Sequence, residues 1–127
     1  MKNKSKWSEF GGKSYRIEDL GRPAIFLLPS RKLRTKMGSK TVEEKFHEFL
    51  AETFGAFTTT AVPYFGFWRN TGAQLIYDEC RLYEVSFAGK EKIPLLLEKL
   101  AEVARAIGEE CIYFKAGQYA CLVHPKP

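Results

Sequence analysis

The sequence predicts an α+β domain with the element order β-α-β-β-α-β and one further short strand at the C-terminus. Three observations predict it: two segments with helical spacing of apolar residues, a long hairpin pattern between them, and an apolar strand ahead of the first helix. The chain has 127 residues, 45% of them hydrophobic, which is enough for one domain with a sizeable core. We expect residues 1–22 to form a basic, partly mobile arm and residues 23–127 to form a single domain.

The first strand is predicted from "PAIFLLPS", residues 23–30. This run is apolar at every position between its two prolines. A continuous apolar run is typical of a strand that is buried on both faces, so we expect it at the centre of the sheet.

The first helix is predicted from Thr41 to about Phe54. Thr41 is a good N-cap, and Glu44 three residues later completes a capping box. Gly55 is a natural stop. The core side of this helix is marked by apolar residues at helical spacing: Val42, Phe46, Phe49, Leu50 and Phe54.

Two long strands and a second helix follow. Threonine, aromatic and β-branched residues dominate "AFTTTAVPYFGFW" and "AQLIYDECRLYEVSF", with a turn signal between them, while Pro63 and Gly66 indicate a bulge or an edge in the first strand. The second helix begins near residue 92, because Pro94 is tolerated only in a first turn, and Gly108 ends it. Two short strands around an Ala-Gly turn close the chain. This order, with two helices on one face of an antiparallel sheet, is the ferredoxin-like pattern.

The charge is concentrated in the first third of the chain. Residues 1–40 hold eleven Lys/Arg against three Asp/Glu, a net charge of +8, whereas residues 41–127 hold nine against twelve, a net charge of −3. Such a split favours a polyanionic partner, although a solubilising arm and an ordinary charged loop explain it equally well. No apolar run approaches the length of a membrane span, and three cysteines without close spacing indicate reduced thiols. We therefore expect a cytoplasmic protein without membrane contact.

The main candidate site is the basic loop, which we define as residues 31–40. It lies just ahead of a predicted helix N-terminus, where unpaired N–H groups and the helix dipole favour anions. Adding five cations there predicts a site for phosphate or another polyanion; a solvated surface loop is the alternative. The residues are Arg31, Lys32, Arg34, Lys36 and Lys40.

The second candidate is a group of aromatic residues in the predicted hairpin. Aromatic side chains on a sheet can stack nucleic-acid bases, but the signature of RNA-recognition modules is missing, and core packing or a dimer interface uses the same residue types. The residues are Tyr64, Phe67, Trp68 and Tyr77.

A third cluster contains Asp78 and Glu79. Adjacent residues on a strand point to opposite faces, so these carboxylates cannot share a proton or a metal without help. His47 and His124 have no partner at ligand spacing. We therefore predict no catalytic residue, no metal and no cofactor.

Part of the chain resembles a known group of proteins. Residues 40–124 contain "FHEFLAETFGAFTTT", "GFW", "TGAQLIYDE", a leucine-rich helix and "EECIYF". This pattern is similar to that of small uncharacterised bacterial proteins with a ferredoxin-like, dimeric α/β-barrel pattern. The resemblance implies the fold and a homodimer, and it brings no catalytic residues with it.

Three functional hypotheses follow. The first, which we favour, is a non-enzymatic binding module for nucleic acid or another phosphate-rich ligand, acting through the basic loop. The second is a protein-interaction or inhibitor module of a phage or plasmid type, acting as a homodimer through its sheet. The third is a small enzyme with a pocket near Asp78 and Glu79.

Overall fold

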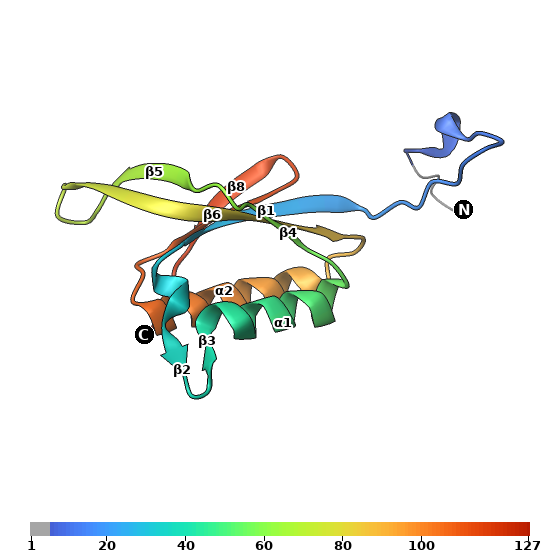
Figure 1. The fold of residues 1–127 in the computed structure, drawn as a ribbon. Coiled ribbons are helices and arrows are strands. Elements are labelled where there is room, and N and C mark those ends of the chain that lie inside the picture. Colours follow the sequence, from blue (N-terminus) through green and yellow to red (C-terminus); the bar gives the residue numbers. More distant parts are fainter. Residues whose placement is uncertain (1–5) are drawn as a thin grey trace.

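The computed structural model describes residues 6–127 and shows an α+β architecture (Figure 1). A six-stranded antiparallel sheet carries two helices on one face and leaves the other face open. The strands of this sheet follow the order β4-β6-β1-β7-β8, and β5 extends it by pairing with β6. The expected α+β class is therefore confirmed. The strands are β1 (Arg22–Pro29), β4 (Thr58–Thr59), β5 (Tyr64–Arg69), β6 (Leu75–Phe87), β7 (Ile112–Ala116) and β8 (Tyr119–Val123).

β1 is a central strand, as its apolar run predicts. It pairs with β6 on one side and with β7 on the other. Its alternate residues Ala24, Phe26 and Leu28 are fully buried under the helices. The intervening Ile25 and Leu27 face the open side and are only partly buried. Burial on both faces was therefore wrong for this strand, because both helices lie on the same face of the sheet.

The two helices are α1 (Val42–Phe54) and α2 (Lys92–Ile107), and both follow the predicted bounds. Thr41 caps α1: its Oγ1 accepts from the Glu44 N–H at 3.1 Å. Gly55 and Gly108 end the helices with φ angles of 80° and 71°, in the left-handed region that glycine adopts without strain. The apolar stripes of the helices meet the buried face of the sheet, where Phe26 contacts the rings of Phe46, Tyr83 and Phe114.

The predicted hairpin is interrupted in its first arm. β4 and β5 both pair with β6, but residues 60–63 separate them, at the position where Pro63 removes a ladder donor. β6 is longer than β1, so the start of β6 and the β5 strand that pairs with it extend past the helices (Figure 1). This projecting hairpin widens the open face of the sheet.

The basic loop and the N-terminal arm each contain short regular elements. The basic loop is not irregular: it contains a short 3-10 helix, η2 (Lys32–Arg34), and a small hairpin of β2 (Lys36–Met37) and β3 (Lys40–Thr41). The N-terminal arm has no strand among residues 6–21; its regular element is a 3-10 turn, η1 (Ser8–Phe10). The arm reaches away from the sheet (Figure 1). Its junction requires Gly21, because at φ 88° a Cβ would lie 2.0 Å from the Phe87 carbonyl oxygen.

Candidate active site on the open face of the sheet

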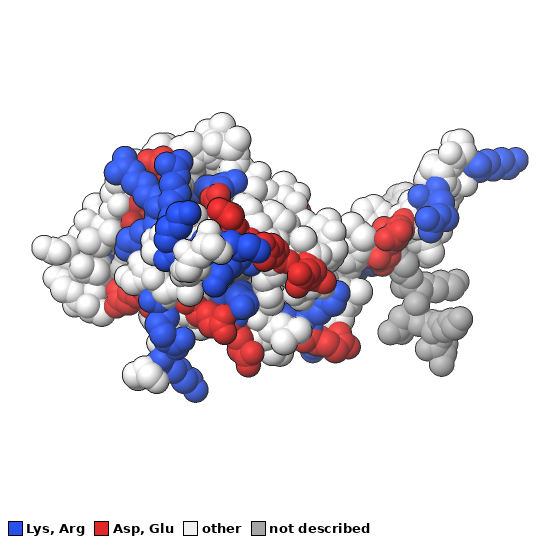
Figure 2. All heavy atoms as spheres, turned by 60° about the horizontal axis from the view of Figure 1, so that its bottom comes forward, with Lys and Arg blue, Asp and Glu red and all other residues white. Residues whose placement is uncertain are grey.

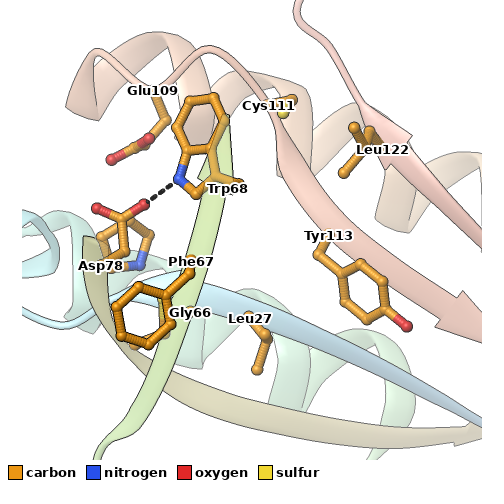
Figure 3. Close-up of a pocket in the computed structure, with 11 residues that line it drawn as sticks. Leu27, Gly66, Phe67, Trp68, Asp78, Glu109, Cys111, Tyr113 and Leu122 are labelled. Atoms are coloured by element: carbon orange, nitrogen blue, oxygen red, sulfur yellow. Dashed lines mark hydrogen bonds between the residues drawn. The ribbon is translucent and has the colours of Figure 1, made fainter. Parts of the chain in front are cut away.

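A pocket of about 230 Å³ lies on the open face, where the projecting hairpin meets the central strands. Its lining is mostly apolar and aromatic, with two carboxylates and two thiols, a composition typical of small-molecule sites. Figure 3 shows the labelled side chains around it. The lining residues are Leu27, Pro29, Gly66, Phe67, Trp68, Asp78, Cys80, Glu109, Cys111, Tyr113 and Leu122.

The pleat of the sheet brings these residues together. In β6, the odd-numbered Tyr83 and Val85 point into the core, so the even-numbered Asp78 and Cys80 point to the open face. The same alternation puts Leu27 of β1 and Tyr113 of β7 on that face. The pocket is therefore a direct consequence of strand order and register.

Trp68 and Asp78 form one wall. The indole Nε1 donates to the Asp78 Oδ2 at 2.7 Å (Figure 3). The two residues are diagonal neighbours across β5 and β6, because Gly66 is the direct partner of Asp78. A Cβ added at Gly66 would meet no atom of the described residues within 4 Å, so the space opposite the carboxylate stays open. The hydrogen bond fixes the plane of the tryptophan ring.

Glu109, just after α2, also lines the pocket. Its side chain is only 8% exposed, although it ends in a carboxylate. The Oε1 of this carboxylate lies 2.8 Å from the Lys32 Nζ. Lys32 itself is exposed and comes from η2. A buried carboxylate needs such a partner, because desolvation of an unpaired charge is costly. The contact places one residue of the basic loop at the edge of the pocket.

The two thiols in the pocket are weak nucleophiles. Burial, helped by the nearby Asp78 carboxylate, raises the pKa of Cys80 to about 11. The pKa of Cys111 is raised as well, again mainly by burial. Because the reactive form of cysteine is the thiolate, both side chains serve as apolar lining at neutral pH.

The remaining cations of the basic loop do not build an anion site at the helix N-terminus. Lys40 is paired with Glu48, and Lys32 with Glu109. Two of the N–H groups at this helix start already have acceptors: Val42 N donates to the Thr35 carbonyl at 2.8 Å, and Glu44 N donates to Thr41 Oγ1. Arg31, Arg34 and Lys36 are exposed, and Figure 2 shows Lys and Arg interleaved with Asp and Glu on the helix side.

The predicted aromatic residues differ in their surroundings. Trp68 and Phe67 both line the pocket, but Phe67 is 65% exposed. Tyr77 is 54% exposed, and its ring centroid lies 5.2 Å from that of Phe67. Tyr64 is also exposed. A role for these residues in stacking or in an interface stays a prediction.

The third cluster is separated by the pleat, as expected. Asp78 lines the pocket, while Glu79 is absent from its lining. His47 is far from both: its Nε2 lies 2.8 Å from the Tyr83 hydroxyl, on the helix side of the sheet. Among residues 6–127, no three His, Cys, Asp or Glu side chains gather closely enough to hold a metal ion.

Sequence reasoning missed three residues of this site: Glu109, Cys111 and Tyr113. They follow α2 directly, and the signal that could have found them is an acidic residue between the helix stop at Gly108 and the start of the next strand. This signal is weak, because charged residues are common after helices.

No segment of the described chain holds a helix that is long and apolar enough to span a membrane. The cytoplasmic location stays a prediction.

Comparison with solved structures identifies relatives of the fold. The chain is similar to a phage SAM lyase. In its complex with S-methyl-5'-thioadenosine, that protein aligns with a TM-score of 0.57 and 12% identity, over 89% of this chain and 96% of that chain. Its apo structure aligns with a TM-score of 0.55 and 15% identity, over 89% and 98%. No protein-family model and no curated protein sequence matches this chain.

This likeness shows a shared fold, and it corrects the functional prediction. Both of these solved structures are of an enzyme. The expectation of a non-enzymatic binding module for nucleic acid, which we favoured over an enzyme, was therefore wrong. Two physical observations agree with the correction: the basic loop is partly neutralised by acidic residues, and two N–H groups at the start of α1 already have acceptors. A nucleic-acid partner, a protein partner and a homodimer are not shown.

Proposed function

We propose that this protein is an enzyme that cleaves S-adenosylmethionine and releases S-methyl-5'-thioadenosine. The observation that carries the proposal is the likeness to a phage SAM lyase over nearly the whole of both chains. That lyase is described in complex with S-methyl-5'-thioadenosine. The pocket on the open face, lined by aromatic rings and two carboxylates, has the chemistry for such a substrate.

The reaction needs one bond to break. S-Methyl-5'-thioadenosine leaves when the bond between the sulfonium sulfur and the Cγ of the methionine part is cleaved, and the bonding electrons stay on sulfur. The four-carbon fragment then forms one new bond by one of two routes. Its carboxylate oxygen bonds to Cγ and forms a lactone, or a pocket carboxylate accepts a proton from Cβ and the C–H electrons form a Cβ–Cγ double bond. Neither route needs water, an oxidant or another co-reactant.

This chemistry fits the side chains that are present. The leaving group is a neutral thioether, so it does not need a proton from an acid. The enzyme has to bind the substrate, orient its two ends and exclude water, and orientation alone contributes large factors to such intramolecular steps. The protonated thiols of Cys80 and Cys111 take no part as nucleophiles.

The pocket offers distinct groups for the parts of the substrate. The flat ring of Tyr113 suits the adenine, since π-faces stack well. Glu109 can accept from ribose hydroxyl groups with its second oxygen, because its Oε1 is the atom paired with Lys32. Lys32 at the edge can pair with the substrate carboxylate.

The proposal is tested by incubating the purified protein with S-adenosylmethionine and measuring S-methyl-5'-thioadenosine by mass spectrometry. The mass of the four-carbon product distinguishes a lactone from an unsaturated amino acid. We expect Glu109→Gln to lower kcat/KM by roughly 10²-fold, because it loosens the orientation of the substrate. Glu79→Gln is the matched control, since Glu79 lies outside the pocket lining. Failure of the folded wild-type protein to release the product above background would reject the proposal.

We also infer the ferredoxin-like topology and a homodimer. The topology is supported by the position of β1 between β6 and β7 in the sheet. It is also supported by the chain order, in which α1 precedes β4 and α2 follows β6. The homodimer is supported by the apolar residues of the open face, such as Leu27 and Leu122, which the helices leave uncovered. Light scattering over a range of concentrations tests the dimer.

A further inference from the structure

Among the described residues that line the pocket, one carboxylate has a charge that is not compensated by a cation. Glu109 has Lys32 at 2.8 Å, which cancels its charge locally. The hydrogen-bond partner of Asp78 is the neutral indole N–H of Trp68. Asp78 is therefore the group that gives the pocket a local negative potential, at the N–H edge of the Trp68 ring.

A sulfonium ion is recognised in a specific way. It carries a permanent positive charge but no N–H or O–H, so it cannot donate a conventional hydrogen bond. It is held by aromatic π-faces and by carboxylates at short range, as other ligand cations are. Trp68 and Asp78 supply both groups in one rigid unit, because the 2.7 Å hydrogen bond fixes the ring against the carboxylate.

We propose that the Trp68–Asp78 pair is the specificity element of the pocket, selecting the sulfonium of S-adenosylmethionine over the neutral thioether of its demethylated analogue. This inference rests on the proposed function. It has a consequence for turnover: bond cleavage removes the positive charge from sulfur, so the thioether product loses this attraction and dissociates more readily than the substrate.

Binding of two stable ligands tests the inference, since S-adenosylmethionine itself would be consumed. Sinefungin carries a protonated amine where the sulfonium stands, and S-adenosylhomocysteine carries a neutral thioether. By titration calorimetry we expect the wild-type protein to bind sinefungin roughly ten-fold more tightly than S-adenosylhomocysteine. Trp68→Leu and Asp78→Asn should each bring this ratio close to one, because sinefungin loses its attraction to the pair, whereas S-adenosylhomocysteine carries no positive charge at this position. The control Glu79→Gln should keep the ratio.

The outcomes separate this inference from the proposed function. If both variants fold, as judged by circular dichroism, and keep the wild-type ratio, the specificity role of the pair is overturned even when S-methyl-5'-thioadenosine is released. If the ratio depends on the pair but no product forms, the cation site stands and the lyase proposal falls. If the wild-type protein binds neither ligand, the specificity inference is overturned, and the release of S-methyl-5'-thioadenosine decides the lyase proposal separately.

Discussion

At the scale of single residues, β6 has different chemistry on its two faces. Asp78 and Cys80 face the pocket, while Tyr83 is completely buried among the rings of the core. The Tyr83 hydroxyl lies 2.8 Å from the Nε2 of His47, which satisfies a polar group that burial would otherwise leave without a partner. The histidine is thus a boundary residue that completes the core, remote from the pocket.

Folding stability should fall when the pH is lowered from about 8 to about 5, because of His47. Burial lowers the pKa of His47 from its ordinary value; the Glu43 carboxylate opposes this effect and Arg81 adds to it. The unfolded chain titrates near the ordinary pKa of about 6.5, so below that pH it binds more protons than the folded chain, and stability is lost down to the lowered pKa. Urea unfolding at several pH values measures the slope.

His47→Gln should flatten this slope, since glutamine does not titrate. His124→Gln is the control, because His124 is exposed near the C-terminus, and it should retain the wild-type slope. An unchanged slope in the His47 variant would show that another group causes the pH dependence.

At the scale of elements, the start of α1 shows how a local signal is realised. Thr41 accepts from the Glu44 N–H, as the capping pattern predicts. The Glu44 carboxylate does not return to the backbone; its Oε1 meets the Thr41 hydroxyl at 3.4 Å. Thr41 also belongs to β3, where it pairs with Lys36. The helix start is therefore tied to the small β2–β3 hairpin that the sequence pattern did not indicate.

Thr41→Ala should lower the free energy of unfolding by about 1 kcal/mol, because the Glu44 N–H loses its acceptor. Thr41→Ser keeps the hydroxyl and should remain close to the wild type. Urea denaturation of the three proteins gives the comparison. Equal losses in the alanine and serine variants would show that the methyl group, and not the cap, stabilises this position.

At the scale of the whole molecule, one aromatic core holds the helices to the sheet. Phe26 lies at its centre: it is fully buried, its ring stacks with Tyr83 at a centroid distance of 5.5 Å, and it meets Phe46 edge-on at 5.7 Å. These contacts join β1, β6 and α1. Within residues 6–127, the open face has no comparable layer over it, which leaves room for the pocket.

Phe26→Ala should lower the free energy of unfolding by about 3–5 kcal/mol, because the cavity lies where three elements meet. The exposed Phe65 on the projecting hairpin is the matched control: Phe65→Ala should change stability by less than about 0.5 kcal/mol. Thermal and urea unfolding measure both. A similar loss in the two variants would show that the hairpin aromatics are also part of the folding core.

The sequence by itself determined the two helices and where they end. Thr41, Pro94, Gly55 and Gly108 act on their own backbone or on the adjacent turn, so their effect can be inferred without knowing the rest of the fold. The apolar stripes then indicated which helix faces are buried. Burial of β1 was overestimated because the pattern of one strand does not show which faces of the sheet are covered.

Only the tertiary structure decided the candidate site. The pocket collects Leu27, Trp68, Asp78, Glu109 and Tyr113, which are far apart in the chain and meet through strand order and register. The same structure paired Lys32 with Glu109 and so turned part of a predicted anion site into the edge of a pocket. Charge and chemistry depend on which side chains are neighbours in space, and that is a long-range property that local patterns do not contain.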